Sequence, residues 1–148
     1  MYQHIMLPLD GSELSLMAVP QAIALAKALR SRMTLITVVS PYHTGVTTPI
    51  TSGIVQDVEK GRDEEARKEA QKMHGDISAR AKSEGIQCES LVVIGDSPYA
   101  LIIENAGERK CDLIVMASHG RRGMDAILVA SETVKVLTHS KIPVLVVR

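Results

Sequence analysis

A short segment with two glycines and two arginines follows the fourth strand-like run of the chain. Gly120 and Gly123 flank Arg121 and Arg122. Glycine lets backbone amides approach an anion closely, and the two guanidinium groups add local positive charge. This combination predicts a cradle for phosphate groups. The alternative for the two arginines is that they are simply solvated.

Two further residues suit a phosphorylated ligand. Ser131 stands at the expected N-terminus of the last helix, where unpaired amides and the helix dipole favour an anion. Asp10 follows the first strand-like run, and its carboxylate can accept hydrogen bonds from ribose hydroxyls. Each has a structural alternative, since Ser131 can be a plain N-cap and Asp10 a turn or cap residue.

Short β-branched runs alternate with helical patterns along the chain, and these elements must position the candidate residues. We expect helices at residues 13–29, 57–84, 98–107 and 131–139, a short helical piece at 124–129, and strands at 5–9, 33–39, 88–94, 112–117 and 143–147. The turn-rich stretch 40–55 is typical of a lid or mobile loop.

This alternation predicts the α/β class. We expect a single domain, residues 1–148, with an open, parallel five-stranded sheet that is doubly wound, with helices on both faces. Ligands of such sheets bind outside the carboxyl ends of the strands. Asp10 and the glycine-containing segment both follow a strand, so we expect the site at that edge.

Composition argues against several classes of protein. Seventeen basic residues balance seventeen acidic ones, and the aromatic side chains are three tyrosines, so we expect no nucleic-acid partner. We see no long apolar run and expect no membrane association. Cys88 and Cys111 are far apart and are expected to be buried, reduced thiols, which together suggests a cytoplasmic protein.

The chain resembles the universal stress protein family over nearly its whole length, and two stretches carry the resemblance most clearly. They are residues 4–12, HIMLPLDGS, and residues 116–147, which include SHG, SET and PVLVV. The nucleotide-binding branch of that family carries Gly, two residues, Gly, nine residues, Gly, then Ser or Thr. The same spacing here joins Ala117, Gly120, Ala130 and Ser131. The resemblance implies a fold like that of the adenine nucleotide alpha hydrolases.

The resemblance also implies a role for each matching residue toward ATP, ADP or AMP, with or without Mg²⁺. Adenine and ribose would contact Pro8, Leu9, Asp10, Val38, Met116 and Ala117, and the phosphates would contact Gly120, Arg121, Arg122, Gly123, Ala130, Ser131, Glu132 and Thr133. Val38 can equally be a core residue of its strand. Two of the three motif glycines are alanines here. Where positive φ is required, alanine costs roughly 1 kcal/mol, or about tenfold in affinity.

The expected function is that of a nucleotide-responsive regulatory domain that acts on a protein partner. The alternative is a dimeric interaction module in stress signalling that binds no nucleotide, which the two alanines favour. Enzymatic activity stays open and would be at most slow ATP hydrolysis or self-phosphorylation. The resemblance further implies a homodimer formed through the C-terminal strand, Val144–Val147.

Overall fold

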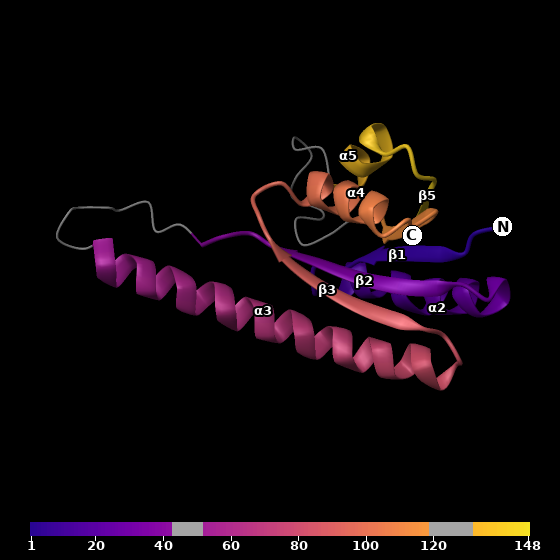
Figure 1. Ribbon diagram of the computed structural model, residues 1–148, viewed down its shortest axis with the longest axis horizontal. Coiled ribbons are helices and arrows are strands. Elements are labelled where there is room, and N and C mark those ends of the chain that lie inside the picture. Colours follow the sequence, from indigo (N-terminus) through magenta and orange to yellow (C-terminus); the bar gives the residue numbers. More distant parts are fainter. Residues whose placement is uncertain (43–51, 119–131) are drawn as a thin grey trace.

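The computed structural model describes residues 1–42, 52–118 and 132–148. Five strands form one sheet in the order β3-β2-β1-β4-β5, and every neighbouring pair is parallel. The strands are β1 His4–Pro8, β2 Arg32–Val39, β3 Cys88–Ile94, β4 Leu113–Ala117 and β5 Val144–Val147. This confirms the predicted α/β class and the parallel five-stranded sheet, with strand bounds within one residue of those expected (Figure 1).

The described helices are α1 Glu13–Leu16, α2 Ala18–Leu29, α3 Ser52–Ser83, α4 Pro98–Glu108 and α5 Glu132–His139. The single helix expected at 13–29 is thus divided at Met17. Pro20 explains the division, because proline has no amide to donate to the carbonyl of Leu16 four residues earlier.

The predicted loop at 40–55 extends too far toward the C-terminus, because residues 52–55 already belong to α3. Apolar residues at helical spacing, such as Ile54 and Val58, favour that earlier start. Residues 43–51, and the short helical piece predicted at 124–129, lie outside the described residues.

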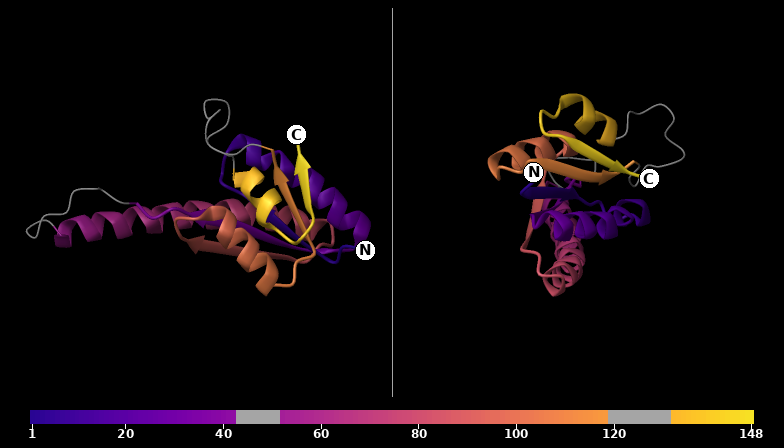
Figure 2. Two further views of the ribbon diagram at one scale, coloured as in Figure 1. Left: turned by 90° about the horizontal axis from the view of Figure 1, so that it is seen from above. Right: turned by 90° about the vertical axis from the view of Figure 1, so that its right-hand side faces the viewer.

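Two hydrophobic cores lie on opposite faces of the sheet. One joins Ile5, Leu7 and Leu35 to apolar residues of α2 and α3. The other joins Met6, Ile36, Ile114 and Met116 to apolar residues of α4 and α5. This follows from the alternation of side chains along each strand, which sends neighbouring residues to opposite faces. Figure 2 shows α2 and α3 on one side of the strands and α4 and α5 on the other.

The long helix α3 packs on the sheet only through its second half. Ala70, Ile77 and Ala81 are buried, whereas Ile54 is 71% exposed and Val58 is 45% exposed. In Figure 1 the first turns of α3 extend past the ends of the strands.

The two cysteines are free, and burial raises the pKa of both thiols. Cys111 is buried as expected, and its thiol pKa is raised to about 11. Cys88 is only partly buried, so the prediction of a buried thiol was wrong for this residue. Within the described ranges, no helix has the length and apolar character needed to cross a membrane.

Candidate functional site

The strand order reverses next to the central strand β1. The chain runs outward from β1 to β2 and β3, then returns to place β4 on the other side of β1. The connection after β1 leads to α1 and α2 on one face, whereas the chain after β4 leads to α5 on the other face. In open parallel sheets, such a reversal creates the crevice in which ligands bind. The carboxyl ends of β1 and β4 are therefore the candidate site.

Asp10 lies in the turn that follows β1. Its Oδ1 atom accepts hydrogen bonds from the amide and the hydroxyl of Ser12, at 2.9 and 2.6 Å. Ser12 in turn caps α1, because its Oγ atom accepts a hydrogen bond from the amide of Ser15 at 3.1 Å. Gly11 has φ of +78°, a conformation that other residues rarely adopt. Asp10 is thus a turn residue, and the turn holds its carboxylate at the carboxyl edge of the sheet.

Three of the residues predicted to contact adenine and ribose lie on the face of the sheet that α4 and α5 cover. Met116 belongs to the core on that face, and Val38 packs against this core while staying partly exposed. Pro8 follows Met6 by two residues along β1 and therefore points to the same face. Leu9 and Ala117 are buried in the opposite core. The predicted set thus surrounds the strand ends from both faces.

The first turn of α5 is fastened to the carboxyl end of β4. The buried hydroxyl of Thr133 donates a hydrogen bond to the carbonyl oxygen of Ala117 at 2.8 Å. This bond brings residues 132 and 133, both predicted near the phosphates, next to the end of β4. The helix N-terminus and the strand end then share one edge of the molecule.

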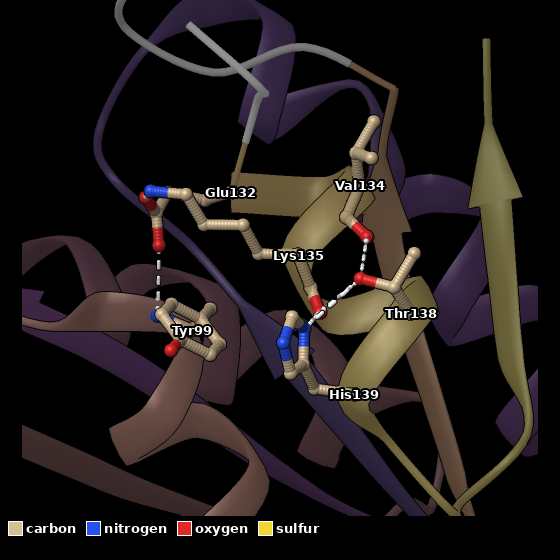
Figure 3. Close-up of polar contacts among 6 residues, drawn as sticks. All are labelled: Tyr99, Glu132, Val134, Lys135, Thr138 and His139. Atoms are coloured by element: carbon tan, nitrogen blue, oxygen red, sulfur yellow. Dashed lines mark hydrogen bonds and ion pairs between the residues drawn. The ribbon is translucent and has the colours of Figure 1, made fainter.

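Glu132 contacts two residues that the sequence did not single out. Its Oε2 atom accepts a hydrogen bond from the amide of Tyr99 at 2.8 Å, and its Oε1 atom lies 2.7 Å from Nζ of Lys135 (Figure 3). The Lys135 contact has a sequence signal, because residues three apart on a helix face each other. The Tyr99 contact has none, since the two residues are 33 positions apart.

Six of the predicted site residues lie outside the described residues: Gly120, Arg121, Arg122, Gly123, Ala130 and Ser131. The remaining eight lie on β1, β2, β4, α5 or the turn after β1. In the part of the chain that the structure describes, no cluster of three or more His, Cys, Asp or Glu residues could hold a metal ion.

An open hollow of about 670 Å³ adjoins this edge of the sheet. Ala117, Ser118 and Thr133 line it near the strand end, and Leu14, Met17 and Val134 are among its apolar walls. Its volume falls within the range of small-molecule sites. Of the predicted site residues that the structure describes, Ala117 and Thr133 line this hollow, so it touches the candidate site at the end of β4.

Comparison with known proteins agrees with this fold. The universal stress protein MJ0531 of Methanocaldococcus jannaschii is 33% identical over 150 residues, which cover all of this chain and 83% of that protein. The solved structure of MJ0577 matches with a TM-score of 0.83 and 26% identity, over 99% of this chain and 96% of the other. A universal stress protein solved in complex with cAMP matches with a TM-score of 0.67 and 27% identity, over 99% of this chain and 97% of that one. The universal stress protein family matches residues 1–148. This chain therefore belongs to the universal stress protein family.

Proposed function

We propose that this protein is a regulatory domain that binds an adenine nucleotide at the carboxyl ends of β1 and β4. The observation that carries the proposal is the reversal of strand order between these two strands. It gathers the turn of Asp10, the end of β4 and the first turn of α5 at one edge. A relative with 27% identity was solved with cAMP, which supports an adenine ligand here.

Each part of the ligand has a candidate contact. Val38 is partly exposed and offers apolar surface for the base beside the buried side chains of Pro8 and Met116, and the carboxylate of Asp10 suits ribose hydroxyls. The phosphates would lie toward the first turn of α5, where amides and the helix dipole favour an anion. Mg²⁺ would bind together with the nucleotide, coordinated by these phosphates. Two free cysteines fit a reducing compartment, and we propose the cytoplasm.

Calorimetric titration of the nucleotide-stripped protein with ATP, ADP and AMP, with and without Mg²⁺, tests this function. We expect micromolar binding that falls at least tenfold in Asp10→Ala and in Ala130→Glu. Asp57→Ala, on the overhanging part of α3, is the matched control and should bind as the wild type does. No binding at millimolar nucleotide would refute the proposal.

A second candidate function is a dimeric interaction module that works without nucleotide, and the sheet edge at β5 favours it. β5 is the last strand in the order, and Leu145 is 43% exposed on it. Val134 and Leu137 of the neighbouring helix α5 are also exposed. An apolar edge strand invites pairing with a second chain. We propose that two copies pair through Val144–Val147, with or without a nucleotide.

The hydrogen bonds of β5 identify a substitution that blocks this pairing. The carbonyl of Pro143, just before β5, accepts a bond from the amide of Ile114 at 2.9 Å, and the carbonyl of Val147 accepts one from the amide of Ser118, just after β4, at 2.8 Å. Because backbone direction alternates along a strand, the amide of Val146 points to the open edge. Val146→Pro removes that amide and should yield a monomer in analytical ultracentrifugation. Val146→Thr keeps the amide and should remain a dimer; a monomeric wild type would exclude this interface.

A further inference from the structure

The carboxylate of Glu132 lies at the N-termini of two helices at once. Glu132 is the first residue of α5, and it accepts a hydrogen bond from the amide of Tyr99 in the first turn of α4. That first turn has no acidic residue, and Ser97 makes no side-chain capping bond to it. One negative charge therefore stabilises both helix N-termini, where the helix dipoles favour it.

The same carboxylate holds the ammonium group of Lys135. The Nζ atom lies 2.7 Å from Oε1 of Glu132 and 5.6 Å from the centre of the Tyr99 ring (Figure 3). Both side chains of the ion pair are about two-thirds buried, at 33% and 39% exposure. The positive charge of Lys135 is thereby engaged by Glu132 and by the ring of Tyr99.

Glu132 is also fixed relative to the end of β4. The next residue, Thr133, donates its hydroxyl to the carbonyl of Ala117, so the first turn of α5 cannot move without breaking a buried hydrogen bond. In the proposed function the phosphates lie toward this turn, where the helix N-terminus favours an anion. The charges of Glu132 and Lys135 largely cancel, so Glu132 withholds from the ligand a positive charge whose attraction would grow with the number of phosphate charges.

We propose that Glu132 sets the phosphate-charge preference of the site and disfavours ATP relative to AMP. This inference rests on the proposed function, because it concerns the same ligand class. Glu132→Gln keeps an oxygen that can accept the bond from Tyr99, removes the negative charge, and frees Lys135 to approach phosphate. Lys135→Gln does the reverse, because it leaves the charge of Glu132 without its partner.

The test is calorimetric titration of wild type and variants with ATP and with AMP, at low and at high ionic strength. We expect Glu132→Gln to raise the ratio of ATP to AMP association constants roughly two- to fivefold at low salt. Lys135→Gln should lower that ratio, and high salt should reduce both changes. Glu108→Gln, an exposed residue at the far end of α4, removes the same charge and should leave the ratio unaltered.

Two results would overturn the inference. One is a ratio in Glu132→Gln equal to or below that of the wild type, and the other is the same gain in Glu108→Gln. In either case the wild type still binds nucleotide, so the proposed function survives. A wild type and a Glu132→Gln variant that both bind no nucleotide refute the proposed function itself, and this inference with it.

Discussion

His74 is hydrogen bonded to Thr37, with 2.8 Å between Nε2 and Oγ1, inside the interface of α3 with the sheet. Its other ring nitrogen, Nδ1, lies 2.7 Å from Oγ of Ser90. The ring is fully buried and thus ties α3 to both β2 and β3. Burial lowers the pKa of His74 from 6.5 to about 4, because the charged ring would lose its hydration.

This histidine predicts a loss of stability in mild acid. The unfolded chain takes up a proton near pH 6.5, whereas folded His74 resists it until about pH 4, so the free energy of unfolding falls as the pH drops through that window. Between pH 7.5 and 5 we expect His74 to account for about 2 kcal/mol. Urea unfolding at both pH values measures it.

The matched variant for that measurement is His74→Gln, which keeps polar atoms in place but does not titrate. Burial also lowers the pKa of His4, which adds to the slope in the same pH range and stays in the variant. The loss of stability in acid should therefore shrink in His74→Gln without vanishing. Equal losses in the two proteins would contradict the prediction.

Thr133→Val should loosen the attachment of α5 to the end of β4. The substitution keeps the shape of the side chain but leaves the carbonyl of Ala117 without the donor it has at 2.8 Å. An unsatisfied buried acceptor costs about 1–3 kcal/mol. Chemical denaturation should show this loss, whereas Thr133→Ser, which retains the hydroxyl, should stay closer to the wild type.

Gly11→Ala and Gly75→Ala should have opposite effects on stability. Gly11 has φ of +78°, and an alanine there costs roughly 1 kcal/mol. Gly75 lies inside α3, and an added methyl group would meet no atom within 4 Å, so alanine should stabilise the helix by about 1 kcal/mol. Thermal melts of the two variants beside the wild type check both signs. A stabilising shift in Gly11→Ala would disprove the positive φ of this turn, and a destabilising shift in Gly75→Ala would contradict the open space beside that glycine.

The two thiols should differ in reactivity toward a disulfide reagent. Cys111 is 5% exposed with a thiol pKa of about 11, so little thiolate forms and little reagent reaches it. Cys88 is partly exposed and should react first in the native protein, although burial raises its pKa as well. Labelling quenched at successive times and followed by peptide mass analysis shows which cysteine reacts first. Faster labelling of Cys111 would be inconsistent with its burial.

The alternation of strands and helices could be predicted from sequence because each element carries its own hydrophobic period. The parallel sheet followed, since βαβ units leave few other arrangements. The division at Met17 was missed even though its cause, Pro20, is visible in the sequence. The start of α3 was missed because residues 52–55 follow a turn-rich stretch and include a glycine.

The candidate site could be predicted less completely than the fold. Asp10 follows a strand and Ala117 ends one, and this local pattern is enough to place both at the carboxyl ends of a parallel sheet. Strand order depends on the packing of distant elements, so the position of the reversal beside β1 required the structure. The bond from Tyr99 to Glu132 joins two helices, and no local pattern reports such a pairing.

The first half of α3 extends beyond the sheet, so a change in the tilt of the helix has its largest effect at its start. From Ser52 to His74 an α-helix measures about 33 Å, and its buried half is held to the sheet around the histidine. A tilt of about 5° about His74 would displace the start of the helix by about 3 Å, given the rise of an α-helix. A small tilt of the buried half of α3 would thus move its exposed first turns much farther than it moves His74.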